Sequence, residues 1–297
     1  ARRGGLGYML PGLTVYIIDR LLRMSRSSRT VKSATATAVG DEYTRLDFTG
    51  GFMAHRAGQY AYINIPAISL LQWHPFTISS TPGDDVTQMH IKDMGPGTFT
   101  HALRKIAEAG AGEPVEIEMF VDGPVGATNL HLGDYDAICL VAGGVGITPC
   151  ASIVGDLMRT GAVMDTMRGK GDKPAPRVSL LWVLKDGRAL AESLNLPTSR
   201  NAEESDFALG LASLDVQAFE TRPTTDRSAP WARSSVQGWD FQQGRPDVWA
   251  SIGQAIPASA KRPLLFACGP ASFVKDAVYA AQKQRPNVLV HTETFEM

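Results

Sequence analysis

Apolar and polar positions alternate in short runs over the first part of the chain. These runs are rich in Val, Ile, Thr, Tyr and Phe, which favour strands, and turn residues separate them. One helical pattern interrupts them at residues 97–110, with Leu103 and Ile106 on one face and Gly110 as its stop. Strands at this spacing predict an antiparallel β-barrel. The expected strands lie at residues 30–39, 43–50, 58–66, 74–80, 86–94 and 113–123.

From residue 134 onward, apolar strands alternate with helical segments. This alternation is typical of a parallel sheet whose strands are joined by crossover helices. Two polar segments, 165–177 and 222–243, are rich in Gly, Pro, Ser, Thr and Arg and are predicted to be flexible insertions. We expect strands at 136–142, 178–184, 214–220, 263–267 and 287–295, and helices at 150–160 and 271–284.

The two patterns predict two domains, and the length of 297 residues agrees because it exceeds the usual size of one compact domain. We place an antiparallel β-barrel at 29–130 and an α/β domain with a parallel sheet at 131–297. Hydrophobic residues at 44% can fill two cores, and a net charge of -1 provides no field that would attract nucleic acid. The odd count of three cysteines without a CxxC pair argues against a disulfide framework and a zinc site.

Residues 1–28 stand outside both patterns. Ala1 opens the chain without a methionine, so we expect a piece of a longer protein. Residues 8–18 are apolar but shorter than the roughly 20 residues that a membrane-spanning helix needs. The arginines that follow are typical of a cytoplasmic flank of a membrane helix, whereas an amphipathic surface helix would also fit the spacing. The pattern alone leaves both interpretations open.

A glycine turn joins the first apolar strand of the α/β domain to its helix. Glycines allow the main-chain amides and the helix N-terminus to approach a pyrophosphate, so a dinucleotide is a candidate ligand here. A tight turn without a ligand is the alternative, because the string GGVGITP is not GxGxxG. The candidate residues are Gly143, Gly144, Val145, Gly146, Ile147, Thr148 and Pro149.

Three places in the barrel domain carry possible flavin chemistry. On the strand WHPFT, Phe76 can cover an aromatic ring system while Thr77 hydrogen-bonds its edge. Lys92, on a neighbouring strand, can meet a phosphate as a point charge. Gly97, Thr98 and Thr100 open the helix of this domain, where a pyrophosphate can bind or Thr98 can act only as the N-cap. Each place also has an ordinary structural interpretation.

Together these strings resemble the ferredoxin-NADP reductase superfamily, and most closely its NADPH oxidase and ferric-chelate reductase branch. The resemblance covers nearly the whole chain. It implies FAD binding by a motif matched by His74, Pro75, Phe76 and Thr77, and by a second motif matched by His90, Ile91 and Lys92. Here Lys92 stands where the family has arginine and loses the bidentate fork, so we expect weak FAD binding. The family's DGPYG string appears at residues 122–126 with Val125 in place of the aromatic residue.

The same resemblance implies NADPH binding by the glycine turn and by further residues. Lys185 and Arg245 are candidates for the ribose 2′-phosphate, which implies a preference for NADPH over NADH. Cys268, Gly269 and Pro270 match the family's segment near the nicotinamide, although Cys268 can equally be a small buried hydrophobe. Phe295 matches a C-terminal aromatic residue that stacks on the flavin and must be displaced by the nicotinamide. Thr77, Cys268 and Phe295 are therefore the candidate catalytic residues.

The resemblance implies a dehydrogenase module that passes hydride from NADPH to FAD and then single electrons to haems. In the family those haems lie in an upstream membrane domain, which would be the partner of this chain and would place it on the cytosolic face of a membrane. Residues 1–28 then become the end of the last membrane helix and a linker. The scattered histidines of the chain itself offer no haem pair. Alternatives are a soluble flavin or ferredoxin-type reductase and a nucleotide-binding regulatory module without turnover.

Overall fold

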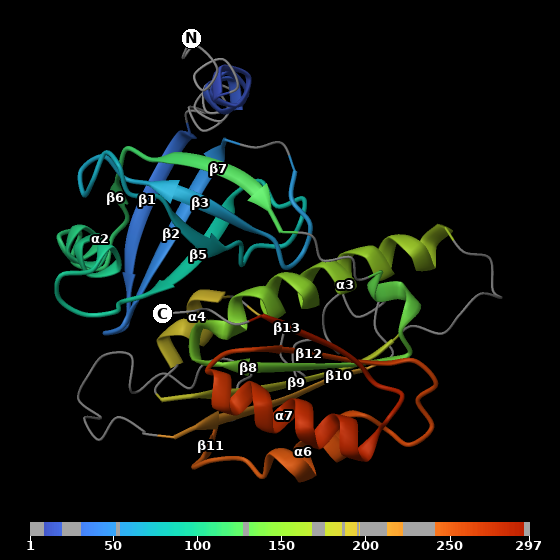
Figure 1. Cartoon of the computed structure of the whole chain (residues 1–297). Helices are drawn as coiled ribbons and strands as arrows, with labels where there is room; N and C mark the ends of the chain where they lie inside the picture. Colours follow the sequence, from blue (N-terminus) through green and yellow to red (C-terminus); the bar gives the residue numbers. More distant parts are fainter. Residues whose placement is uncertain are drawn as a thin grey trace.

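The computed structural model describes residues 9–19, 31–51, 54–126, 131–167, 176–185, 188–194, 196, 213–221 and 241–293. Two antiparallel sheets form the first domain and a parallel sheet with helices on both faces forms the second, as Figure 1 shows. This agrees with the fold class predicted from the sequence. The two predicted insertions lie largely outside the described residues.

The first domain combines a four-stranded sheet of order β5-β2-β1-β6 with a three-stranded sheet of order β4-β3-β7. Apolar side chains from both sheets and from one helix face a common core, including Phe48, Ile63, Met89, Ile91 and Leu103. The elements are β1 (Val31–Val39), β2 (Tyr43–Gly50), β3 (Tyr60–Asn64), β4 (His74–Thr77), β5 (Thr87–Lys92), α2 (Phe99–Glu108), β6 (Val115–Glu116) and β7 (Phe120–Val125). The predicted strand at 113–123 is wrong in one respect, because it is divided into β6 and β7.

The second domain is built on a six-stranded parallel sheet of order β11-β10-β9-β8-β12-β13. Helices α6 and α7 cover one face, and α3 covers the other face between the sheet and the first domain (Figure 1). The elements are η1 (Leu132–Asp134), β8 (Ala137–Gly143), η2 (Gly144–Gly146), α3 (Ile147–Met167), β9 (Arg177–Leu184), α4 (Arg188–Leu194), β10 (Ser213–Glu220), β11 (Phe241–Gln243), α6 (Val248–Ala255), β12 (Pro263–Cys268), α7 (Ala271–Gln284) and β13 (Leu289–Glu293).

Four elements of this domain differ from the sequence prediction. Helix α3 is longer than expected and includes residues 165–167, which the prediction assigned to an insertion. The other predicted insertion ends in β11, an edge strand of three residues. Helices α4 and α6 were not predicted, because each is only two turns long and periodicity over so few residues gives little signal.

The domains share a continuous contact. Val39, Tyr43 and Ala57 of the first domain belong to the same apolar cluster as the buried faces of α3 and α4. The hydroxyl of Ser152 on α3 donates to the main-chain oxygen of Ser80, 2.8 Å away. Arg159, one turn or more further along α3, donates to Asp84 in the same β4–β5 connection. The sheet that carries the dinucleotide motif is therefore fixed against the domain that carries the flavin motif.

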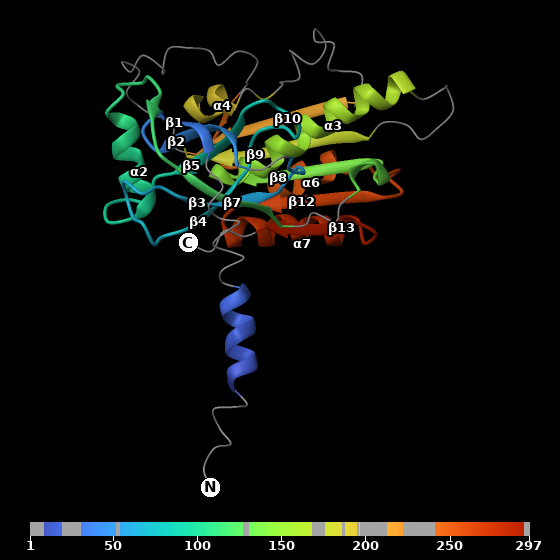
Figure 2. The same ribbon diagram turned by 90° about the horizontal axis from the view of Figure 1, so that it is seen from above.

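Residues 9–19 form a short helix that stands apart from both domains in Figure 2. Its large apolar side chains, among them Met9, Leu10, Val15 and Ile18, are exposed. Among the described residues no helix is both long and apolar enough to cross a membrane.

Candidate functional site

The predicted nucleotide-binding residues lie along one edge of the parallel sheet. Since all six strands run in the same direction, their carboxyl ends meet at one edge, which is where ligands bind in open α/β sheets. The glycine turn follows β8 at the centre of that edge. Lys185 and Arg245 follow β9 and β11 on one side, and the segment Cys268–Pro270 ends β12 on the other side. Sequence positions more than 100 residues apart are thus brought into one row.

The glycine turn is held tightly on its inner side. A Cβ atom at Gly146 would lie 2.4 Å from the main-chain oxygen of Cys268, and one at Gly269 would lie 2.8 Å from the Cα atom of Gly143. The indole nitrogen of Trp182 on β9 donates to the oxygen of Gly144 at 3.0 Å. Two main-chain segments can approach this closely only because both contain glycine.

The outer side of the same turn is open. A Cβ atom at Gly144 would have no heavy atom within 4 Å, and the φ angle of this residue is +57°. Thr148 bonds back to the oxygen of Val145 at 3.0 Å and so shapes the turn itself. Ile147, Thr148 and Pro149 are buried at the start of α3. Thus the turn is open at Gly144, directly before the N-terminus of α3, and a glycine turn in this place fits a pyrophosphate.

On the β9–β11 side of the edge, a buried carboxylate lies beside one basic side chain, and two further basic residues follow the strands. Lys185 and Arg245 are exposed. Glu220, the last residue of β10, is only 1% exposed and lies in register between Leu184 of β9 and Gln243 of β11. Its carboxylate lies 3.9 Å from Nε of Arg188 and accepts a hydrogen bond of 3.3 Å from Gln243. Neither Glu220 nor Arg188 was singled out from the sequence, because each stands alone among residues of no recognisable motif.

On the other side of the edge, Cys268 and Glu293 face each other across β12 and β13. Cys268 is fully buried, and burial together with the charge of Glu293 raises the pKa of its thiol well above the usual range. Burial also raises the pKa of Glu293 to about 7, while His291 lies 3.7 Å away. Glu293 was not predicted from the sequence, although its place at the carboxyl end of a strand at this edge is a signal that could have identified it.

The flavin motif forms β4 and points two rings to the same side. His74 and Phe76 alternate with Pro75 and Thr77 along the strand, and both rings pack against Phe99, the first residue of α2. The ring centroids of His74 and Phe99 are 4.3 Å apart. Thr77 is buried and pairs with Tyr60 of β3, whereas Pro75 is exposed. His74 and Phe76 therefore lie on one face of the strand, and Pro75 and Thr77 lie on the other.

One atom of this motif needs a partner that the described residues do not supply. Nε2 of His74 is buried and makes no hydrogen bond with any residue that the structure describes. Burial lowers the pKa of this imidazole, so the ring is neutral near pH 7 and can donate one hydrogen bond. A buried polar atom without a partner costs about 1–3 kcal/mol. A phosphate oxygen of FAD at this position would remove that cost, so the residues fit the cofactor.

The second flavin motif, on β5, is less open than the sequence suggested. The ammonium of Lys92 lies 3.3 Å from the carboxylate of Glu42 and is 30% exposed. Ile91 is buried in the core of the first domain, so only its main chain can face a ligand. His90 is 4% exposed, and both ring nitrogens are within 2.9 Å of serine hydroxyls. Of this motif, only the side chain of Lys92 has an exposed cationic group.

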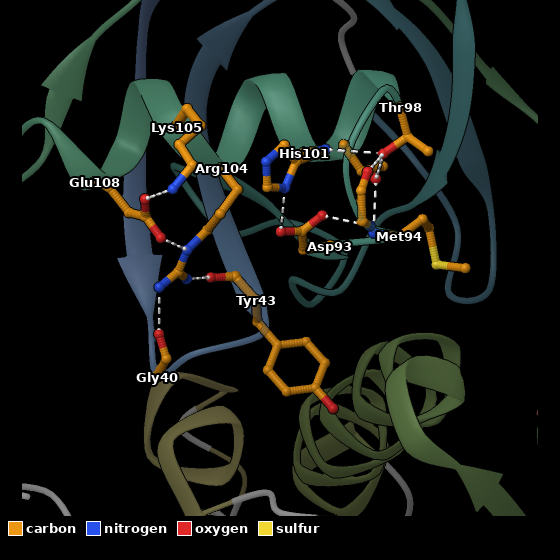
Figure 3. A network of polar contacts seen from close by, with 11 residues as sticks. Gly40, Tyr43, Asp93, Met94, Thr98, His101, Arg104, Lys105 and Glu108 are labelled. Carbon is orange, nitrogen blue, oxygen red and sulfur yellow. Dashed lines mark hydrogen bonds and ion pairs between the residues drawn. The ribbon is translucent and has the colours of Figure 1, made fainter.

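The start of α2 is a closed hydrogen-bonded loop, shown in Figure 3. Thr98 caps the helix by accepting from the amide of His101 at 3.1 Å, and its own hydroxyl donates to Gly95. The hydroxyl of Thr100 accepts from the amide of Met94 at 3.0 Å. The interpretation of Thr98 as an N-cap is thus confirmed. A Cβ atom at Gly97 would have no neighbour within 4 Å, which leaves the outside of this loop open.

The flavin motif and the Cys268–Glu293 side of the edge lie near each other across the domain contact. Burial raises the pKa of Tyr60 in β3, and the charges of Tyr62 and then of Glu293 add to this effect. Glu293 belongs to the second domain and Tyr60 to the first, directly beside Thr77. The structure therefore brings the predicted flavin strand close to β13. Phe295, two residues beyond β13, lies outside the described residues, and its role stays a prediction.

Comparison with protein families divides the chain at the same place. A family model described as an FAD-binding domain matches residues 28–129. A second, described as a ferric reductase NAD binding domain, matches residues 135–282. The flavin motifs fall in the first match, and the glycine turn, Lys185, Arg245 and Cys268 fall in the second.

Similar curated proteins include oxidases and reductases. "Ferric reduction oxidase 3, mitochondrial" of Arabidopsis thaliana is 30% identical over 222 residues, which are 73% of this chain and 29% of that protein. "NADPH oxidase 1" of Mus musculus is 28% identical over 280 residues, which are 90% of this chain and 45% of that protein. The chain therefore spans less than half the length of either relative.

The fold also matches solved structures. A ferredoxin NADP+ reductase from Neisseria gonorrhoeae with bound FAD and NADP superposes with a TM-score of 0.59 and 14% sequence identity, over 89% of this chain and 98% of that chain. At this identity the likeness shows the two-domain fold alone.

Proposed function

Because the chain belongs to the ferric reductase and NADPH oxidase family, we propose that it takes hydride from NADPH onto FAD and passes the electrons on one at a time. The reaction needs little acid–base chemistry from the protein, which has to hold the two ring systems together and bind their phosphates. FAD, when bound, accepts a two-electron hydride and releases single electrons.

One observation carries the proposal: the order of groups along the carboxyl edge of the sheet. Basic residues lie at one end, the open glycine turn lies in the middle, and Cys268 and Glu293 lie at the end near the flavin strand. A dinucleotide has its adenosine phosphate, its pyrophosphate and its nicotinamide in the same order. The arrangement supports NADPH lying across the edge with its nicotinamide toward the first domain.

In the first domain we assign the flavin ring to Phe76 and Thr77 and its phosphates to His74. Phe76 would lie against the ring system, and Thr77 would hydrogen-bond its edge. His74 would donate from its buried Nε2 atom to a phosphate oxygen, which the absence of another partner among the described residues supports. The open loop around Gly97 and the cation of Lys92 would complete the phosphate site.

At the adenosine end we assign the 2′-phosphate of NADPH to Lys185 and Arg245, with Arg188 beside them. Lys185 follows β9 and Arg245 follows β11, the two strands on either side of β10, and both side chains are exposed. The Nε atom of Arg188 lies 3.9 Å from the Glu220 carboxylate, which keeps the guanidinium at this end of the edge. A planar guanidinium can bind phosphate with two of its nitrogens.

The electrons leaving FAD would pass to haems in a membrane domain outside this chain, with oxygen or ferric chelates as final acceptors. The names of the relatives support both acceptors. The exposed apolar side chains of residues 9–19 support a connection to such a domain, which would place the module on the cytosolic face. We propose that domain as the partner of the chain.

Anaerobic titration tests this function on the chain as it stands. The purified chain is loaded with FAD, and NADPH is added while the flavin absorbance is followed. We expect stoichiometric bleaching of the flavin, and strong inhibition in Gly144→Val, which fills the open side of the turn. Gly112→Val, at another open glycine with a positive φ angle, in the turn between α2 and β6, is the matched control for backbone strain. Full FAD occupancy without any bleaching by NADPH would contradict the proposal and favour a nucleotide-binding module without turnover.

A further inference from the structure

His90 is a buried histidine that connects the two domains. It lies on β5 of the first domain, opposite Arg45 on β2. Its Nδ1 atom is 2.8 Å from the hydroxyl of Ser79 in the same domain. Its Nε2 atom is 2.9 Å from the hydroxyl of Ser193, which belongs to α4 of the second domain and lies 103 residues away along the chain. Both ring nitrogens are therefore engaged, one on each side of the domain boundary.

His90 is neutral at physiological pH, and its tautomer sets the direction of both hydrogen bonds. Burial lowers the pKa of His90 to about 3, the charge of Arg45 lowers it further, and a main-chain hydrogen bond with Ser193 opposes these effects. A neutral imidazole donates from one ring nitrogen and accepts at the other. The Ser79 hydroxyl also lies 3.0 Å from the main-chain oxygen of Gln88, so Ser193, His90, Ser79 and Gln88 form one hydrogen-bonded chain.

Helix α4 is itself fixed to both domains. Leu190, Ala191 and Leu194 are buried in the cluster beneath α3 and next to the parallel sheet. The opposite side of the helix touches the β1–β2 turn, where a Cβ atom at Gly40 would lie 2.8 Å from that of Ala189.

Hydrogen bonds from α2 of the flavin domain fix the β1–β2 turn. Arg104 of α2 donates to the main-chain oxygens of Gly40 and Tyr43, and the Tyr43 ring points toward the helices of the second domain in Figure 3. The same helix α2 begins at the loop assigned to the flavin phosphates. A small shift of α4 would therefore displace residues at both cofactor sites.

We propose that His90 is a positioning residue for hydride transfer, which ties β5 of the flavin domain to Ser193 of α4 and so sets the distance between the two cofactor rings. The inference rests on the proposed function. Hydride transfer needs reacting atoms about 3–3.5 Å apart, and a displacement of about 1 Å can slow such a step by about 100-fold. A directional hydrogen bond across the boundary limits sliding that apolar packing alone would allow.

Removal of the Ser193 hydroxyl tests this role without touching the flavin motif. In FAD-loaded Ser193→Ala we expect flavin reduction at saturating NADPH to slow about tenfold and the charge-transfer absorbance between the rings to weaken. The Kd for FAD and the KM for NADPH should stay within about twofold, because no phosphate contact is lost. Ser193→Thr keeps a hydroxyl and should restore most of the rate. Thr160→Ala, whose hydroxyl bonds only within α3, is the matched control.

Hydrogen exchange supplies a readout that does not depend on turnover. In the FAD-loaded chain, Ser193→Ala should increase amide exchange in β5 and α4 together and leave the strands β12 and β13 protected. If the wild-type chain does not transfer hydride at all, the proposed function is wrong. The hydrogen-exchange experiment then still shows whether His90 joins the domains. An unchanged reduction rate and charge-transfer band in Ser193→Ala would overturn the inference. A loss of FAD affinity in that variant would also overturn it, because His90 would then serve the flavin directly.

Discussion

Cys268 and Glu293 lie opposite each other at the carboxyl ends of two parallel strands, with both side chains largely withdrawn from water. Burial raises the pKa of both groups, so near neutral pH the thiol is protonated and the carboxyl group is poised between its two forms. The thiol is therefore not a nucleophile. The charge of the pair near neutral pH therefore depends on the carboxyl group of Glu293 alone.

Glu293→Gln should change how stability depends on pH. The pKa of Glu293 is about 7 in the fold against an ordinary value of 4.5. Because the raised pKa disfavours the charged form in the fold, stability is lost as the pH rises from about 4.5 to 7 and is constant above that. The glutamine variant lacks this loss, so the difference in unfolding free energy between the two proteins should change by up to about 3 kcal/mol across that window.

Urea unfolding of both proteins at pH 5 and pH 8 checks this prediction. Glu108→Gln is the control, because hydrogen bonds from Lys105 and Arg104 lower the pKa of that carboxyl group to about 2, and its loss should not change the difference between pH 5 and pH 8. Parallel pH profiles for wild type and Glu293→Gln would show that the carboxyl group is solvated in solution.

Lys92→Ala and Glu42→Gln should move FAD affinity in opposite directions. Loss of the ammonium removes one charge-assisted phosphate contact, worth about 1.5–3 kcal/mol or roughly tenfold or more in Kd. Loss of the Glu42 charge frees the ammonium from its ion pair and should tighten binding. Fluorescence titration with FAD measures both, and Lys105→Ala is a control lysine in the same domain. Equal affinities in all four proteins would remove Lys92 from the flavin site.

Lys185→Ala and Arg245→Ala should each reduce the preference for NADPH over NADH. Each removes one contact to the 2′-phosphate, so the ratio of kcat/KM values for the two nucleotides should fall by roughly tenfold. Binding of 2′-AMP, measured by calorimetry, gives the same comparison without turnover. Lys261→Ala alters an exposed lysine at the amino edge of β12 and should leave the ratio unchanged. A constant ratio in both site variants would place the phosphate elsewhere.

Gly155→Ala should disturb the domain contact. The new Cβ atom on α3 would lie 2.0 Å from the hydroxyl oxygen of Thr81 and 3.0 Å from its Cβ atom. Overpacking of this kind costs about 1–3 kcal/mol. Thr81→Ala in the same chain removes the nearer atom and should recover part of the melting temperature and of the flavin reduction rate. Gly133→Ala, where nothing lies within 4 Å, is the neutral control. A fully stable Gly155→Ala variant would mean that the helix and the β4–β5 connection move apart at little cost.

Much of the architecture is readable from the sequence because its periodicities are strong. The continuous apolar run of β8 predicts a strand buried on both faces, and every residue of β8 is buried. Helix α4 and strand β11 were not predicted, because neither is long enough to show a periodic pattern of apolar residues.

Residues of the candidate site could be predicted only where they belong to a recognisable sequence motif. The glycine turn and the β4 motif could be located, and Thr98 could be identified as a helix cap. The hydrogen bonds of His90, by contrast, depend on Ser193, 103 residues away, and no local pattern reports such a contact. The same holds for Glu220 and Arg188, which meet only through the folding of α4 against β10.

One stopped-flow comparison tests most directly whether this chain transfers hydride from NADPH to FAD. The FAD-loaded chain is mixed anaerobically with saturating NADPH, or with NADPH carrying deuterium at the transferred position of its nicotinamide. We expect single-phase bleaching of the flavin that is measurably slower with the deuterated nucleotide, because the bond between the nicotinamide carbon and the transferred hydrogen breaks in the step that reduces the flavin. Bleaching at the same rate with both nucleotides, or none at full FAD occupancy, would contradict the proposed hydride transfer.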